Sequence, residues 1–199
     1  MRLFAAVDLA APVRHAAFAA GEDLARALAG PGARGRLRVS WVREENLHLT
    51  VRFLGEIEDG RVGDLGAAFC APLATEAFDL ELGGVGVFPP SGPPRVIWIG
   101  IRQGAERLAA LSAEVDARFE ALGFGRGDRP LRAHLTIARC KDAIDRQMRD
   151  RLLGADPGAL GASRVEEVVL YESRLSARGP TYAPLARAPL SAWGRLQED

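Results

Sequence analysis

Apolar and polar residues alternate along two stretches of the chain, and the two stretches share a core sequence. The first reads LHLTVRFL over residues 47–54, and the second reads AHLTIAR over residues 133–139. Alternation with a period of two is typical of a β-strand that buries one of its faces. The pattern therefore predicts two strands of related sequence that lie far apart in the chain.

Strict alternation divides each predicted strand into a polar and an apolar face. His48 and Thr50 share the polar face of the first strand, and His134 and Thr136 share that of the second. The apolar faces are expected to hold Leu47, Leu49, Val51 and Phe53 in the first strand and Leu135 and Ile137 in the second. One His-x-Thr pair is commonly a plain surface feature. Packing constrains only the apolar face, so two copies indicate one cleft with two imidazoles and two hydroxyls.

The remaining elements follow from spacing and from turn residues. Apolar residues at helical spacing predict helices over 11–29, 61–74, 103–122 and 142–153. Extended segments are predicted over 2–9, 41–42, 78–88, 95–101, 162–171 and 181–190, with turns at 43–46 and 172–175. Glycines 83, 84 and 86 indicate a bulge or a close backbone approach. Because no helix follows these glycines, they lack the context of a dinucleotide-binding loop.

The order of these elements suggests an internal duplication. Each motif strand is followed by a helix and two extended segments. We therefore expect two halves related by a pseudo-two-fold axis, with the motif strands at the centre. The predicted fold is α+β, with mostly antiparallel sheets and outer helices. Residues 1–199 are expected to form one domain of two closely packed lobes, each with one motif.

Composition narrows the possible partners and compartments. The 199 residues carry 26 basic and 26 acidic side chains, so the net charge of zero gives no overall attraction to nucleic acid. Lys141 is the only lysine. Arg34, Arg36 and Arg38 share one predicted loop that either holds an RNA backbone or is simply solvated. The chain opens without a signal-peptide pattern and contains no membrane-spanning apolar run, so we expect a cytoplasmic monomer that does not bind membranes.

The other histidine and the two cysteines give weaker signals. His15 falls in the first predicted helix without a partner motif, and we interpret it as a solvated residue. Cys70 and Cys140 have no metal-binding or redox spacing. Cys140 follows the second motif, but no base is paired with it in the sequence, and a small buried thiol is the commoner case.

Two histidines in one cleft suit acid–base chemistry. The imidazole pKa of about 6.5 makes both protonation states accessible near neutral pH. Threonine hydroxyls two residues further on can donate hydrogen bonds to phosphoryl oxygens. A zinc site is less favoured, because such sites need three or four ligands and neither motif face has a nearby carboxylate or thiolate. We expect no metal and no cofactor.

The two motifs resemble the paired H-x-T-x signatures of the two-histidine (2H) phosphoesterase superfamily, and most closely its RNA 2′,3′-cyclic phosphodiesterases, the LigT-like 2′-5′ RNA ligases. The resemblance covers nearly the whole chain, including residues 2–8, 41–47, 86–89 and 170–173. It implies that His48 is the proton donor to the leaving 3′ oxygen and His134 the proton acceptor. It also implies that Thr50 and Thr136 bind the phosphate and that Arg139 lies near it, although strict alternation puts Arg139 on the opposite face.

The resemblance further implies a substrate and leaves alternatives open. The expected substrate is RNA with a 2′,3′-cyclic phosphate end or a small cyclic nucleotide, the product is a 2′-phosphate, and the reverse reaction forms a 2′-5′ linkage. Another cyclic phosphate, a 2′-5′ oligonucleotide or a non-catalytic RNA-binding role are the alternatives. The family often has proline before the second motif histidine and before Glu45, where this chain has Ala133 and Glu44. Both differences remove backbone stiffness and no catalytic atom.

Overall fold

The structure is a computed structural model that describes residues 1–29, 38–127, 131–176 and 179–191. The helices are α1 (Ala11–Leu28), α2 (Asp59–Phe69), α3 (Ala105–Ala121) and α4 (Arg146–Gly154), with a 3-10 turn η1 (Glu44–Asn46). The strands are β1 (Arg2–Asp8), β2 (Val39–Trp41), β3 (His48–Glu56), β4 (Leu73–Glu76), β5 (Phe78–Phe88), β6 (Val96–Gln103), β7 (Leu135–Cys140), β8 (Ala159–Val165), β9 (Glu167–Ser176) and β10 (Gly179–Ser191). The motif strands are β3 and β7.

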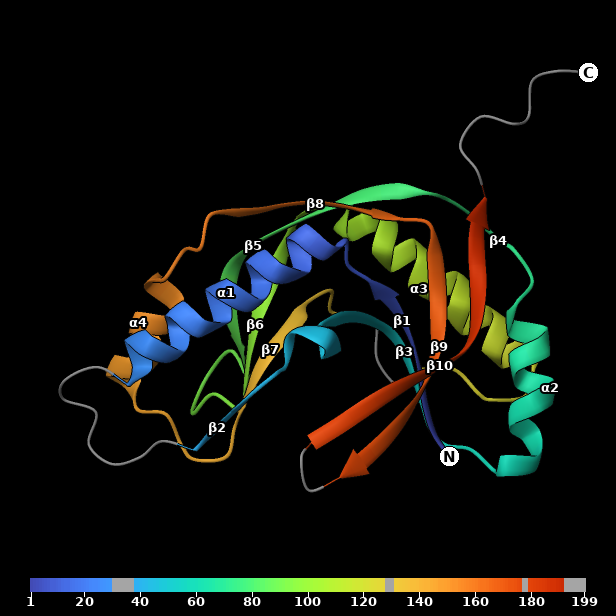
Figure 1. The fold of residues 1–199 in the computed structure, drawn as a ribbon, viewed down its shortest axis with the longest axis horizontal. Coiled ribbons are helices and arrows are strands. Elements are labelled where there is room, and N and C mark those ends of the chain that lie inside the picture. The colour runs from blue at the N-terminus through green and yellow to red at the C-terminus, as the bar shows by residue number, and fades with distance from the viewer. Residues whose placement is uncertain (30–37, 128–130, 177–178, 192–199) are drawn as a thin grey trace, which may run out of the picture.

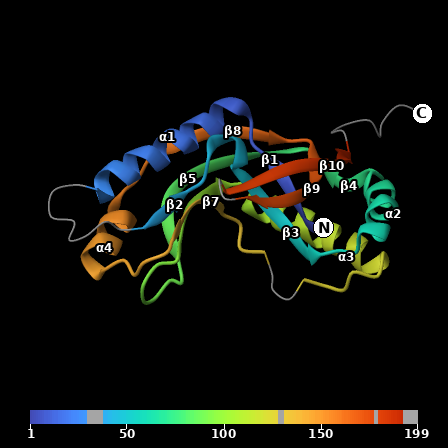
Figure 2. The same cartoon turned by 60° about the horizontal axis from the view of Figure 1, so that its bottom comes forward.

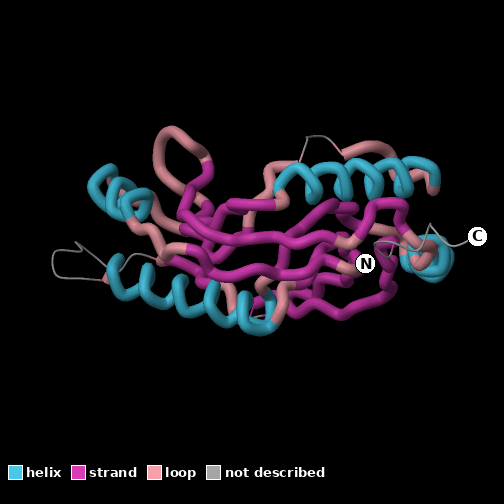
Figure 3. The backbone as a smooth tube through the Cα atoms, turned by 90° about the horizontal axis from the view of Figure 1, so that it is seen from above, coloured by secondary structure: helices cyan, strands magenta, loops and turns pink. Residues whose placement is uncertain are grey.

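Within the described residues the strands form two five-stranded sheets. The first has the order β3-β1-β9-β10-β4, and the second has the order β2-β7-β6-β5-β8. All neighbouring strands are antiparallel except β10 and β4, which are parallel. In Figure 3 the strands occupy the middle of the molecule and the helices lie outside them. The predicted α+β fold with mostly antiparallel sheets and outer helices is therefore confirmed.

Two of the helices, α1 and α3, pack on the sheet opposite to the one from which the chain enters them. The chain enters α1 directly after β1 of the first sheet, yet α1 contacts β7 and β8 of the second. In the same way α3 follows β6 of the second sheet and contacts β3 and β4 of the first. The helices α2 and α4 contact β10 and β5, respectively. Each sheet therefore has two covering helices, and one of them arrives from the other sheet (Figure 1).

The internal duplication is visible in the strand orders. After β3 the chain runs through α2, returns to the far edge of the same sheet as β4, and crosses to the second sheet as β5. After β7 it runs through α4 and β8 in the same manner and crosses to the first sheet as β9. The additional strands are β2, at the edge beside β7, and β10, between β9 and β4. The two motif strands contact each other, and in Figures 1 and 2 they lie near the middle of the molecule.

Each motif strand has a β-bulge at the same place, directly after its threonine. The register of β1 and β3 shifts so that Val51 is the extra residue, and that of β6 and β7 shifts so that Ile137 is the extra one. A bulge inserts one residue into a strand and so reverses the faces beyond it. The prediction that Phe53 shares the face of Leu49 is therefore wrong. Phe53 is 55% exposed and lines the cleft beside the motif.

The boundaries after α2 differ from the prediction. The helix ends at Phe69 and not at residue 74, and the chain then forms the unpredicted strand β4. Two side chains of α3 hold this segment. Arg118 donates hydrogen bonds to the carbonyls of Phe69, Ala71 and Pro72, and Glu114 accepts the N–H of Thr75 at 2.9 Å. These contacts join residues more than 35 positions apart, which a local pattern does not contain.

Two further predictions near the C-terminus are corrected. The predicted strand 162–171 is two strands, because the chain leaves the second sheet after Val165 and enters the first at Glu167. The predicted turn 172–175 is wrong, since β9 continues to Ser176 as one arm of a long hairpin with β10. Helix α4 begins at Arg146, later than predicted, because Asp145 caps it by accepting the N–H of Met148 at 2.8 Å.

The glycine-rich part of β5 behaves as predicted. The register with β6 shifts between Leu82 and Val85, and Gly84 has a φ of 73°. A Cβ atom on Gly86 would lie 2.1 Å from the ring of Trp98. Only glycine therefore allows the indole to lie against the backbone of β5.

Among the described helices, none is long and apolar enough to cross a membrane.

Candidate active site

A cleft of about 740 Å³ lies where the motif strands meet. Its lining includes the five residues singled out in the sequence: His48, Thr50, His134, Thr136 and Arg139. The ends of β9 and β10, which project at the bottom of Figure 1, add part of the wall. Residues from β1 and from the segment before β3 complete it. The two distant motifs are therefore brought together around one cavity.

The two histidines make the same hydrogen bond to the main chain. Nδ1 of His48 lies 2.8 Å from the carbonyl oxygen of Asn46, and Nδ1 of His134 makes the equivalent bond to the carbonyl of Arg132. A carbonyl can only accept, so Nδ1 of each ring carries a proton and donates it. Nε2 is then the atom of each ring that gains and loses a proton. Nε2 of His48 lies 3.0 Å from the hydroxyl oxygen of Thr50.

Burial lowers the pKa of both imidazoles, because it penalises the charged form. For His48 the carbonyl of Asn46 and the carboxylate of Asp8 act in the opposite direction. For His134 the carbonyl of Arg132 does so. The positive charge of Arg139 lowers the pKa of both rings. Both histidines therefore favour the neutral form in the unliganded cleft, and a bound anion would reduce that preference.

Aromatic rings surround both histidines. Phe4 and Tyr182 lie 4.9 and 5.1 Å from the ring of His48, centroid to centroid. Phe88 contacts the ring of His134 edge-on at 5.0 Å. These neighbours contribute to the burial of both rings, and they restrict how far each imidazole can turn. Each imidazole is thus held both by packing against aromatic rings and by a hydrogen bond to a main-chain carbonyl.

Positive side chains line the cleft. They are Arg2, Arg43, Arg139 and Lys141, and the described lining contains no carboxylate. Arg43 is engaged, with an ion pair to Glu45 at 3.0 Å and a hydrogen bond to the carbonyl of Pro180. Across the described part of the chain, the side chains of Arg2, Arg139 and Lys141 have no ion-pair partner within 4.0 Å. A cleft of this kind attracts anions.

The bulge at Ile137 explains the position of Arg139. Because Ile137 and Ala138 both face the core, the next residue returns to the face of Thr136. Arg139 is exposed and lines the cleft. Strict alternation, which put Arg139 on the face of Leu135, is therefore wrong at this position. Arg139 and Phe53 occupy equivalent places, each three residues after its motif threonine.

The other residues considered in the sequence lie outside this centre. Arg38 is paired with Asp142, with its Nη2 atom 2.8 Å from the carboxylate, so its guanidinium is already engaged. Arg34 and Arg36 lie outside the described residues. Burial raises the pKa of the Cys140 thiol, which disfavours the nucleophilic thiolate. His15 is exposed on α1 near Glu44. The described residues contain no group of three or more His, Cys, Asp or Glu side chains that could hold a metal ion.

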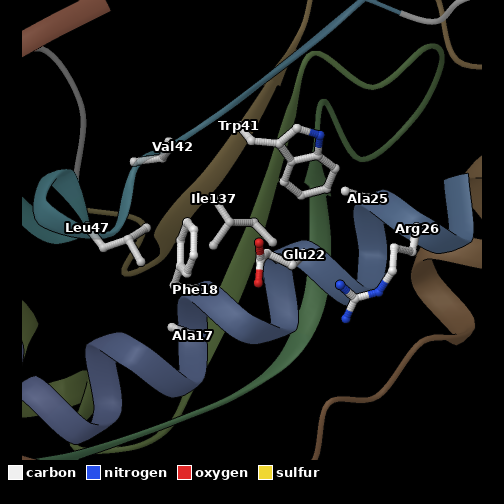
Figure 4. A pocket seen from close by; sticks show the side chains of 10 residues that line it. Ala17, Phe18, Glu22, Ala25, Arg26, Trp41, Val42, Leu47 and Ile137 are labelled. Carbon is white, nitrogen blue, oxygen red and sulfur yellow. The ribbon is translucent and has the colours of Figure 1, made fainter. Parts of the chain in front are cut away.

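A second cavity lies on the other side of β2. It measures about 330 Å³ and is formed by one face of α1 together with Trp41, Val42, Leu47 and Ile137. Figure 4 shows Phe18 and Ile137 side by side near its centre, and its charged residues are Glu22 and Arg26. Ile137 is the bulge residue of the second motif strand, so this cavity lies against the side of that strand that faces away from the candidate active site. Trp41 and Val42 line both cavities.

Comparison with known proteins agrees with the duplicated architecture. A family model described as LigT like Phosphoesterase matches twice, at residues 14–98 and 99–182, and each match contains one motif. The chain belongs to this phosphoesterase family. An RNA 2′,3′-cyclic phosphodiesterase of Archaeoglobus fulgidus is 32% identical over 185 residues, which cover 93% of this chain and 98% of the relative. One of Aeropyrum pernix is 32% identical over 156 residues, which cover 78% and 88%.

Solved structures resemble this LigT-like phosphoesterase in fold as well as in sequence. A Thermus thermophilus protein is 29% identical and superimposes with a TM-score of 0.73 over 98% of this chain and all of that one. Escherichia coli LigT complexed with 3′-AMP is 29% identical, with a TM-score of 0.69 over 96% of this chain and 98% of the other.

The structure of this LigT-like phosphoesterase adds cleft neighbours that the sequence alone did not single out. Asn46 holds His48 through its carbonyl, and its side-chain amide donates to the carbonyl of Pro180 at 2.9 Å. Tyr182 packs against His48 from β10. Asp8 is the register partner of His48 on β1. Asn46 and Asp8 lie in stretches that resemble the family, whereas Tyr182 lies in none of those stretches.

Proposed function

We propose that this phosphoesterase hydrolyses RNA ends that carry a 2′,3′-cyclic phosphate and leaves a 2′-phosphate. The observation that supports this most is the pair of motif histidines in one cationic cleft, each held through Nδ1 by a main-chain carbonyl so that Nε2 is the nitrogen that exchanges protons. Relatives named RNA 2′,3′-cyclic phosphodiesterase cover most of the chain and agree with this activity.

The reaction requires one base and one acid on opposite sides of phosphorus. Neutral His134 takes a proton from water at Nε2 as the water oxygen bonds to phosphorus. The bond from phosphorus to the 3′ oxygen breaks, and His48 gives its Nε2 proton to that oxygen. The products are a 2′-phosphomonoester and a 3′-hydroxyl, and the two histidines have exchanged protonation states. This scheme needs no metal and no cofactor.

The other motif residues stabilise the charge that develops at phosphorus. Thr50 and Thr136 can donate hydroxyl hydrogen bonds to the non-bridging oxygens. Arg139 can add two parallel hydrogen bonds from its guanidinium fork. Since Arg139 lowers the pKa of both histidines in the free cleft, a phosphate that neutralises it would favour protonation of His48. The same change would also raise the pKa of His134, so it does not decide which of the two histidines is protonated.

Phe53 favours a substrate that carries a nucleobase over a cyclic phosphate that lacks one. Phe53 is 55% exposed and lines a positively charged cleft. Its ring centroid lies 5.8 Å from that of Phe4. A base can stack on such a ring without sequence preference. The small cyclic phosphates remain the second candidate, because they would use the same histidines.

The reverse reaction, in which a 5′-hydroxyl end replaces water, would form a 2′-5′ linkage. We expect the chain to act in the cytoplasm as a monomer, as one domain of two lobes.

The test is incubation with an RNA that ends in a 2′,3′-cyclic phosphate, followed by separation of the product isomers. The proposal predicts a 2′-phosphate end, and predicts a lower kcat/KM for the matching cyclic mononucleotide. A 3′-phosphate product would contradict the assigned leaving group. No turnover of either substrate, by protein that still binds the RNA, would favour a non-catalytic RNA-binding role.

A further inference from the structure

The matching bulges allow the two halves of the cleft to be compared residue by residue. Ala6 on β1 is the register partner of Thr50, and Trp98 on β6 is the register partner of Thr136. In each half the bulge follows the threonine directly. The neighbouring strands β1 and β6 are therefore in equivalent registers, and any difference between them at the histidines is a difference in residue type and not in alignment.

The two halves differ in whether a carboxylate lies opposite the motif histidine. Asp8 is the register partner of His48. On the other side Ile99 pairs with Leu135, and continuing this register by one residue places Gly100 opposite His134. One histidine therefore has an acidic neighbour on the adjacent strand, and the other has a residue without a side chain. Gly100 also has little room for one, since an added Cβ would lie 3.0 Å from the carbonyl oxygen of Gly83.

The carboxylate of Asp8 is held in place from the neighbouring strand on its other side. The hydroxyl of Tyr171 lies 2.9 and 2.8 Å from its two oxygens and donates its hydrogen to them. The ring of Tyr171 stacks on Phe4 at 5.5 Å, and Phe4 in turn lies 4.9 Å from His48. Asp8, Tyr171, Phe4 and His48 thus form one packed cluster across three neighbouring strands. Asp8 is not among the residues that line the cleft, so it is not placed to contact the substrate.

The other charged and titratable groups around His48 do not supply this difference. The cleft presents Arg2 from β1, Arg43 from the turn before β3, Tyr182 from β10, and His134, Arg139 and Lys141 from the second motif segment. The cations oppose protonation, and Arg139 lowers the pKa of both histidines. Asp8 raises the pKa of His48, whereas no carboxylate contributes to that of His134.

We propose that Asp8, oriented by Tyr171, is a positioning residue that makes His48 the proton donor by stabilising its imidazolium. The inference rests on the proposed function, because it explains how two nearly equivalent motifs divide the acid and base roles. The first half of the fold carries the acid because it carries the carboxylate. The second half, with Gly100 at that position, leaves His134 as the neutral base.

The direct test is the Asp8→Asn variant, which removes the charge and keeps an oxygen that can accept from Tyr171. NMR titration of the free protein should show His48 titrating at lower pH than in the wild type, with His134 unchanged. Asp8→Glu, which keeps the charge, should titrate nearer to the wild type. Asp79→Asn is the matched control, since Asp79 pairs with Arg164 between β5 and β8, away from the cleft. An unchanged His48 titration in Asp8→Asn, or an equal change in both histidines, would overturn the proposal.

Kinetics on the cyclic phosphate complete the test. The basic limb of the kcat/KM profile reports loss of the acid's proton, so it should move to lower pH in Asp8→Asn while the acidic limb stays. Above that limb kcat/KM should fall about tenfold for each pH unit. If the basic limb does not move, Asp8 does not set the proton affinity of the acid, and the proposal fails. If the wild type does not turn over the substrate, the proposed function fails, and the NMR titration still decides whether Asp8 sets the proton affinity of His48.

Discussion

Nδ1 of His48 donates a hydrogen bond of 2.8 Å to the carbonyl oxygen of Asn46, two residues earlier at the end of the 3-10 turn η1. The equivalent bond joins His134 to Arg132. This contact determines which nitrogen of each ring exchanges protons, and it orients that nitrogen without a side-chain partner. The predictions below depend on this arrangement and on the residues that line the cleft.

Single replacement of either histidine should slow turnover strongly. His48→Ala and His134→Ala are each expected to lower kcat about 10²- to 10⁴-fold, the usual contribution of general acid–base catalysis. The double variant should lose much less than the product of the two, because acid and base act as a unit. The check is steady-state kinetics on the cyclic phosphate, with His15→Ala as the exposed control. Multiplicative losses would argue that the histidines act independently.

Arg139→Lys should weaken catalysis although the charge is retained. Lysine has no planar fork and cannot donate two parallel hydrogen bonds to a phosphate. We expect a higher KM, a lower kcat, or both, with a fold that is unchanged by circular dichroism. Arg38→Lys is the matched control, because Arg38 is engaged with Asp142. Kinetic constants equal to those of the wild type would reduce Arg139 to a structural role.

The free energy of unfolding should fall as the pH drops below about 6.5, the ordinary histidine value. The pKa of both motif histidines is lowered in the folded state. Between that lowered pKa and about 6.5 the unfolded chain therefore binds more protons, and stability decreases as pH falls. Urea denaturation between pH 8 and 5.5 should show a shallower decrease in a His48→Asn, His134→Asn double variant. An identical decrease would show that other groups govern stability in this window.

Chelators should leave activity intact, since the proposed acid and base are both imidazoles and the scheme has no step for a metal. The measurement is the initial rate on the cyclic phosphate before and after dialysis against EDTA. A loss of rate that zinc or manganese restores would contradict a metal-free reaction.

The sequence predicted the fold class because the two alternating motifs revealed the duplication and the spacing of the apolar residues revealed the helices. It did not predict β4, which among the described residues pairs only with β10, more than 100 residues away. It also assigned Phe53 and Arg139 to the wrong face. Strict alternation contains no information about a bulge, which is set by pairing with β1 and β6. The same limitation applies to Asp8, since its place beside His48 depends on the register between two strands.

The dependence of the two histidine variants on the leaving group distinguishes the acid from the base. An aryl phosphodiester releases a phenolate that needs little protonation, whereas a ribose 3′ oxygen needs a proton donor. If His48 is the acid and His134 the base, the aryl substrate should restore much of the rate of His48→Ala and leave His134→Ala slow. Restoration of His134→Ala alone would reverse the two roles. Restoration of neither variant would contradict acid catalysis by His48 and indicate that the histidines mainly bind the phosphate.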